Sequence, residues 1–240
     1  MNLTPEELLQ NWEKHLKIVN AYISSPRKEK LLSMFNVLED KMITSPASGK
    51  THFHNAFVGG YVEHVNRVVE YSLRTYQLWK EVGAEIDFTE EELVFCALVH
   101  DIGKIGDGER EGYLPQKDKW RQEKMNEYFT NNKEIPFMLI PDRTLYLLQK
   151  FEINLNYNEY LTIRIHDGLY EDINKPYFIT TQPEAKLRTN LPFILHQADS
   201  LAARVEYERG LRLQPKTSST EKVKKALPSS GGLLNIVKDL

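Results

Sequence analysis

The sequence of 240 residues predicts an all-α fold, a helical bundle with N-terminal helices and a long loop insertion after a His-Asp pair. Two observations predict this class. Apolar residues recur at intervals of three and four along much of the chain, which is the spacing of one face of a helix. No long segment alternates apolar and polar residues, as a half-buried strand would.

The first region, residues 1–45, is expected to form helices that pack on the core. Thr4, a proline and Glu7 follow the order of a capped helix start, with a carboxylate at the third helical position. A second helical pattern begins at Ser25-Pro26. The segment 44–50 is rich in Ser, Pro and Gly, which predicts a loop.

Residues 46–209 are expected to form the core. Thr89 and the three glutamates after it predict a capped helix that runs into His100-Asp101, where glycines end it. The polar, glycine-rich stretch 106–122 predicts a long exposed loop. The expected core helices cover residues 60–79, 89–101, 141–151, 158–166 and 191–209.

The last region, residues 210–240, has linker-like composition around a short basic stretch at 221–227, which is expected to be helical. It holds six Lys or Arg against two Asp or Glu, a local charge of +4. We expect a peripheral, solvated tail. Contact with a nucleic acid or a partner is the alternative.

Composition excludes several function classes. A net charge of −3 does not indicate a protein that depends on attraction to phosphate backbones. The single cysteine, Cys96, cannot form an intramolecular disulfide, which fits a reducing compartment. The first residues do not resemble a signal peptide, and the apolar run 93–99 is too short to span a bilayer. We therefore expect a soluble cytoplasmic protein without membrane contact.

Histidine and aspartate residues form the main chemical pattern. A histidine on one helix, a His-Asp pair closing a second and an aspartate on a late helix could converge on one point. Imidazole nitrogens and carboxylate oxygens are the ligands of borderline divalent metals such as Mn, Fe, Co, Ni or Zn. The residues concerned are His64, His100, Asp101 and Asp199.

This pattern resembles the HD superfamily of metal-dependent phosphohydrolases over roughly residues 52–207. The segment His100-Asp101-Ile-Gly-Lys matches the central motif of that superfamily at every position, and 195–199 is similar to its last motif. The segment 54–64, with a Gly-Gly pair between two histidines, resembles the branch that contains 3′→5′ exoribonucleases.

The resemblance implies a divalent metal ion, with Mg as a further option, and favours one ion over two. It implies four core ligands, His64, His100, Asp101 and Asp199. His166 and His196 are candidates for a second ion or for support of the first. Lys104 is implied as a phosphate contact, with the alternative that it caps a helix.

Other residues around these ligands are candidates for substrate chemistry. Arg67 lies three residues after His64 and is expected to offset phosphate charge or to form a salt bridge. His54 is a candidate for binding phosphate or orienting its loop, and Asp167 or Glu171 for the general acid. A substrate lid that stacks a base is expected in the loop insertion at Tyr113, Lys117, Trp120 and Arg121, with a plain solvated loop as the alternative. His15 and His52 are expected to be ordinary surface or loop residues.

Together these features predict a metal-dependent phosphohydrolase that cleaves a phosphate ester of a nucleotide with a metal-activated water. A phosphodiesterase or 3′→5′ exonuclease acting on RNA or DNA is the first alternative, and a non-catalytic nucleotide-sensing module the second. The expected partner is a small-molecule nucleotide, with nucleic acid as the alternative. The sequence pattern selects no oligomeric state.

Overall fold

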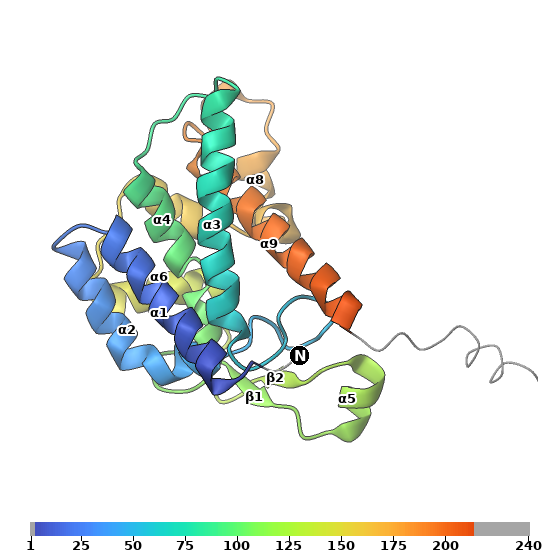
Figure 1. Ribbon diagram of the computed structural model, residues 1–240. Coiled ribbons are helices and arrows are strands. Elements are labelled where there is room, and N and C mark those ends of the chain that lie inside the picture. Colours follow the sequence, from blue (N-terminus) through green and yellow to red (C-terminus); the bar gives the residue numbers. More distant parts are fainter. Residues whose placement is uncertain (1–2, 214–240) are drawn as a thin grey trace, which may run out of the picture.

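Helices form nearly all the regular structure of residues 3–213, the part of the chain that the computed structural model describes (Figure 1). The expected all-α class is confirmed. The helices are α1 (Pro5–Tyr22), α2 (Arg27–Thr44), α3 (Gly60–Glu81), α4 (Glu90–Val99), α5 (Lys119–Met125), α6 (Ile140–Lys150), α7 (Tyr157–Ile165), α8 (Lys175–Phe178) and α9 (Leu191–Leu213). Two strands, β1 (Tyr113–Pro115) and β2 (Phe129–Asn131), and short 3-10 turns complete these elements.

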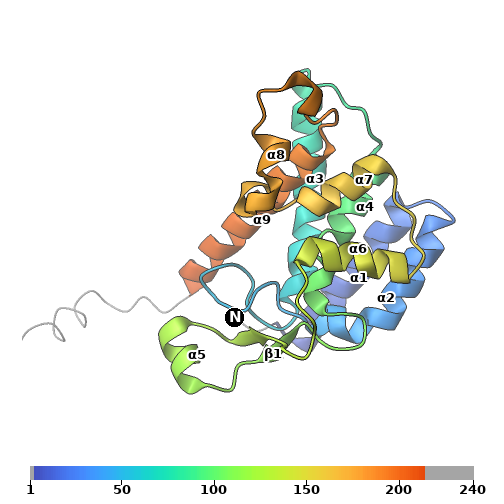
Figure 2. The same ribbon diagram turned by 180° about the vertical axis from the view of Figure 1, so that it is seen from behind.

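Helix α3 stands at the centre and packs along α9, with α4 against its other side (Figure 1). Helices α1 and α2 cover one flank and contact α3. Helices α6 and α7 lie on the opposite face, seen from behind in Figure 2, and α7 contacts both α4 and α9. All seven residues from Leu93 to Val99 are buried, so α4 is the most enclosed helix and its end lies deep in the bundle.

Capping residues define several helix starts. Thr4 and Thr89 both form the expected capping box. The threonine side chain accepts a hydrogen bond from a backbone N–H, and the glutamate three residues later accepts one from the backbone N–H of the threonine. Asn156 forms a third box with Glu159, and α7 therefore begins one residue before the expected position. Each cap typically contributes about 1 kcal/mol.

A Gly-Gly pair joins the N-terminal helices to the core. Gly59 has φ of +85°, and a Cβ there would lie 2.1 Å from Leu8 Cδ2 of α1. A Cβ on Gly60 would lie 2.1 Å from the carbonyl oxygen of Asn55. The two glycines thus let α1 and the preceding loop approach the start of α3.

His15 is not the surface residue that was expected. It is fully buried, its ring stacks on Trp12, and its Nδ1 lies 2.9 Å from Oδ1 of Asn66 on α3. It lies on the buried face of α1 with Trp12 and Val19, so helical periodicity was the available signal. The exposed position expected for His52 is confirmed.

The expected exposed loop 106–122 is in part wrong, because much of the insertion is an ordered hairpin. Strands β1 and β2 pair antiparallel, with Leu114 opposite Thr130, and α5 lies between them in the chain. Gly49 connects the hairpin to the preceding loop, because its carbonyl oxygen accepts hydrogen bonds from the N–H groups of Tyr128 and Phe129. Three-residue strands are too short to produce a visible alternation, which explains the error.

The chain beyond Leu213 lies outside the described residues, including the short basic helix expected at 221–227. Helix α9 continues four residues past its expected end at 209. The division into residues 1–45, 46–209 and 210–240 stays a prediction. Within residues 3–213, no helix combines the length and the apolar character that crossing a membrane requires.

Candidate metal centre

Three helices, α3, α4 and α9, bring the four expected core ligands to one point in the bundle. His64 from α3 places Nε2 3.1 Å from Oδ1 of Asp199 on α9 and 3.7 Å from Oδ2 of Asp101. His100, at the end of α4, places Nε2 3.4 Å from the same Asp101 oxygen and 3.9 Å from Asp199. Nitrogen and oxygen atoms at these separations can share one ion.

The backbone at the end of α4 explains how the adjacent side chains of His100 and Asp101 can both reach the same point. Successive helical side chains project about 100° apart. The last α4 residue is Val99, His100 keeps helical angles, and Asp101 leaves them with φ −107° and ψ 9°. The backbone therefore turns between the two side chains, as the glycines after Asp101 predict.

Helix α6 holds this turn in place. The Thr144 hydroxyl donates to the carbonyl of His100 and accepts from the N–H of Gly103, both at 3.0 Å. A Cβ on Gly103 would lie 2.4 Å from the carbonyl oxygen of Ile140. The glycine is therefore required for close approach of α6, and α6 in turn fixes the backbone of the His-Asp pair.

The nitrogen and oxygen atoms at this point are suitable ligands for a divalent cation. Among the described residues, Nε2 of His64 and Nε2 of His100 are buried and make no well-oriented hydrogen bond. Nδ1 of His100 lies 2.9 Å from the carbonyl of Ala97, which makes it the donor and leaves Nε2 with its lone pair. Two imidazole nitrogens and the oxygens of Asp101 and Asp199 suit Mn, Fe, Co, Ni or Zn.

Charges at the centre also favour a cation. Burial lowers the pKa of His64, but the carboxylates of Glu206 and Asp199 outweigh it and raise the pKa to about 10. Burial opposes ionisation of Asp101, yet Lys104 and His100 hold the pKa of that carboxyl well below its usual range. Asp101 and Asp199 thus stay ionised, and the carboxylates around His64 stabilise a positive charge at the centre.

Lys104 lies directly on a candidate ligand. Its Nζ is 2.5 Å from Oδ2 of Asp101, and 16% of its side chain is exposed. Burial lowers the pKa of Lys104, but the Asp101 carboxylate raises it above the ordinary value. The ammonium therefore balances Asp101, and its role as a phosphate contact stays a prediction.

Of the two extra histidines, the structure brings one to the centre. His166, at the end of α7, has Nε2 3.5 Å from Oδ1 of Asp101 and 3.6 Å from Oδ1 of Asp167. His196 instead places Nδ1 2.8 Å from the carbonyl of His166. Its ring packs on Gly168, where a Cβ would lie 2.4 Å from it. His196 thus supports the backbone that carries His166.

Arg67 and His54 occupy different positions around His64. Arg67 donates to Glu206 at 2.9 Å and to Glu63 at 2.8 Å, so it forms the salt bridges that were its alternative role. His54 lies with its ring 4.6 Å from that of His64, and its buried Nε2 has no partner among the described residues. Burial, His64 and Lys104 lower the pKa of His54 to about 3, which keeps it neutral.

Sequence reasoning missed two residues beside His64. The Glu206 carboxylate lies 3.0 Å from Nδ1 of His64 and is fully buried. The buried Tyr61 hydroxyl has no hydrogen-bond partner within residues 3–213, and burial together with nearby Asp101 raises its pKa well above normal. Helical spacing was the available signal, since Tyr61 precedes His64 by three residues and Glu206 follows Asp199 by seven.

The expected lid residues separate into two groups. Tyr113 on β1 is half-buried, and burial raises its pKa although nearby Lys104 lowers it. The other three lie at or near α5. Lys117 is exposed, Trp120 is 60% exposed, and Arg121 pairs with Glu127 at 3.0 Å.

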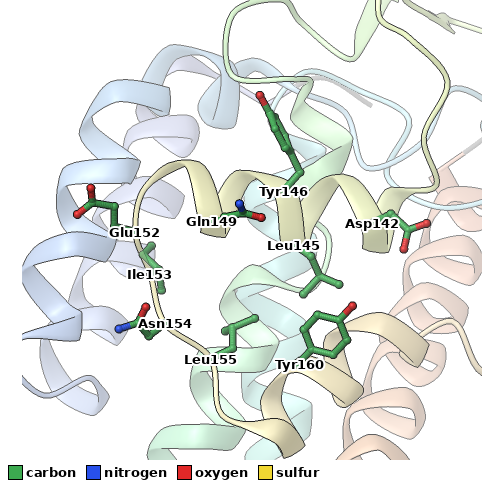
Figure 3. A pocket seen from close by; sticks show the side chains of 9 residues that line it. All are labelled: Asp142, Leu145, Tyr146, Gln149, Glu152, Ile153, Asn154, Leu155 and Tyr160. Carbon is green, nitrogen blue, oxygen red and sulfur yellow. The ribbon is translucent and has the colours of Figure 1, made fainter.

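A separate cavity of about 480 Å³ lies between α6, α7 and the segment that joins them (Figure 3). Leu145, Leu155 and Tyr160 lie between the two helices, whereas Tyr146 points away from them. None of its lining residues is a candidate ligand. The cavity is therefore distinct from the metal centre.

Comparison with known families agrees with this geometry. The chain matches the HD domain over residues 68–204. The chain belongs to the HD domain family. HD domains are generally metal-dependent hydrolases, and the matched region contains His100, Asp101 and Asp199. His64 lies before it and joins the site through the fold. No curated protein and no solved structure matched the chain.

Proposed function

We propose that this HD protein hydrolyses a phosphate ester of a nucleotide, using water activated at a divalent ion. The observation that carries the proposal is the convergence of two buried, unpartnered imidazole nitrogens with two ionised carboxylates. The ligands would be His64, His100, Asp101 and Asp199. One ion is proposed, because these four residues share one point; His166 is the nearest further donor.

A bound divalent ion supplies a Lewis acid that polarises a phosphoryl oxygen and lowers the pKa of a coordinated water. The protein residues bind and orient the reactants around it. Lys104 reduces the net negative charge at Asp101, so an anionic phosphate meets less repulsion. His54 is neutral and offers its free Nε2 to a phosphate oxygen or a water.

Ester hydrolysis forms one P–O bond to water and breaks the P–O bond to the alcohol, which needs a proton as it leaves. Asp167 is the proposed donor. Its carboxylate is 34% exposed and lies 3.6 Å from Nε2 of His166. The pair can therefore hold a proton between the buried centre and solvent.

A phosphodiesterase or 3′→5′ exonuclease is the second candidate. The observation that favours it is the hairpin, which carries exposed Trp120 three positions after the exposed cation Lys117. Exposed aromatics with nearby cations suit stacking and backbone contacts to single-stranded nucleic acid.

A substrate panel tests the proposal. Purified protein with Mn²⁺ or Co²⁺ would be incubated with nucleoside mono-, di- and triphosphates, cyclic nucleotides, and short RNA and DNA. Asp101→Asn serves as the inactive control. Cleavage of nucleotides alone supports the first proposal, and cleavage of oligomers or cyclic diesters supports the second. If the protein binds nucleotides tightly in the presence of metal but does not cleave them, both proposed activities are wrong and a nucleotide-sensing role takes their place.

A further inference from the structure

We propose that Glu206 is a positioning residue that holds His64 in the orientation and tautomer required to bind the metal. The inference rests on the proposed metal centre and extends it to a residue outside the HD match at 68–204. The observation behind it is a contact between α9 and α3 that spans 142 positions of the chain.

The first step is the placement of Glu206. It follows Asp199 by two helical turns, so both side chains lie on the face of α9 that packs along α3. The Glu206 side chain has no exposed surface. A buried carboxylate is costly unless its oxygens are bonded, so the position of Glu206 requires partners.

Both Glu206 oxygens have such partners. Oε2 lies 3.0 Å from Nδ1 of His64, and Oε1 accepts from Nε of Arg67 at 2.9 Å. Arg67 is itself held by Glu63, one turn earlier on α3. His54, His64 and Glu206 also lie close enough to be considered as a separate cation site. Because both carboxylate oxygens of Glu206 are already engaged, a support for His64 is the better assignment.

The consequence concerns the other ring nitrogen. A carboxylate that accepts from Nδ1–H fixes a proton there, so Nε2, which faces Asp199 and Asp101, is the nitrogen left to bind the metal. It also makes that imidazole a stronger ligand. His100 and His166 direct Nδ1 to the backbone carbonyls of Ala97 and Ile163 instead. His64 therefore receives a charged support that the other two do not.

Co²⁺ binding to the full chain tests the role without a substrate. Metal-free wild type, Glu206→Gln and Glu206→Ala would be titrated with Co²⁺ while affinity, stoichiometry and the visible absorption spectrum are recorded. Circular dichroism confirms that each variant is folded. We expect about 10- to 100-fold weaker binding in both variants and a changed Co²⁺ spectrum. Glu208→Gln is the matched control, because Glu208 is on the same helix but exposed and paired with Arg204; its affinity should equal wild type.

A double-mutant cycle separates positioning from simple loss of negative charge. In a His64→Ala background, Glu206→Gln should cause no further loss of affinity if Glu206 acts through His64. If Glu206→Gln causes the same loss of Co²⁺ affinity in both backgrounds, Glu206 acts only through its charge at a distance, and the inference is overturned. Unchanged affinity and spectrum in the Glu206 variants would also overturn it.

Two further outcomes separate this inference from the proposed function. If wild type binds two ions and Glu206→Ala loses one while the other binds as before, Glu206 is a ligand and the positioning role is wrong. If wild type binds no Co²⁺, the metal centre itself is refuted, and the inference falls with it.

Discussion

Replacing Gly103 by alanine should destabilise the fold and weaken the metal centre together. The added Cβ would lie 2.4 Å from the carbonyl oxygen of Ile140 and 3.0 Å from the N–H nitrogen of Thr144. Both are backbone atoms of α6, which cannot rotate away as a flexible side chain would. Helix α6 must therefore move as a unit.

The cost follows from what that movement breaks. Overpacking of a tight contact costs about 1–3 kcal/mol. The displaced Thr144 hydroxyl would lose its bonds to His100 and Gly103, each contributing about 1 kcal/mol. We expect the free energy of unfolding to fall by about 3–5 kcal/mol. Co²⁺ affinity should fall as well, because the His-Asp turn loses its support.

Urea denaturation at constant metal concentration measures this change. Gly210→Ala is the control, since that glycine lies in α9 and no atom of the described part of the chain is near the added Cβ; it should be neutral or stabilising by up to about 1 kcal/mol. Thr144→Val should reproduce part of the loss without the clash. A Gly103→Ala protein within about 0.5 kcal/mol of wild type, a surface-like effect, would refute the assigned contact between α6 and the turn.

Three further predictions concern other regions. Burial lowers the pKa of His15 to about 4, from 6.5 in an unfolded chain, so the unfolded state binds more protons as pH falls through this window and stability should fall by up to about 3 kcal/mol. Urea midpoints between pH 7 and 4 should show this loss in wild type and not in His15→Gln; parallel pH curves would contradict it. Thr89→Ala should cost about 1 kcal/mol through loss of the α4 cap, and an unchanged melting midpoint would argue against the capping box. Removal of metal with a chelator should abolish hydrolysis, and Mn²⁺ or Co²⁺ should restore it in wild type but not in Asp101→Asn; activity that survives the chelator would exclude metal-dependent chemistry.

Local interactions explain which parts of the fold the sequence predicted. Thr4 and Thr89 bond within their own first turns, so their signals depend on neighbouring residues only. Helical periodicity likewise reports one face of one helix. The sequence did not predict the hairpin, because its pairing joins two three-residue strands that are separated in the chain by α5.

The chemistry of the candidate site was also readable from residue types. Histidine and aspartate side chains are able to ligate divalent metals, and the glycines after Asp101 predicted the turn that brings His100 and Asp101 together. Their roles as ligands stay a prediction until metal binding is measured.

By itself, the sequence determined the helical class and the capped helix starts, and it predicted the set of residues that would bind a divalent metal. Only the tertiary structure decided that His166 faces Asp101 while His196 bonds to backbone, and that Glu206 contacts His64 across 142 positions. These contacts depend on how α3, α7 and α9 pack against one another, because helix packing joins residues that no local sequence pattern connects.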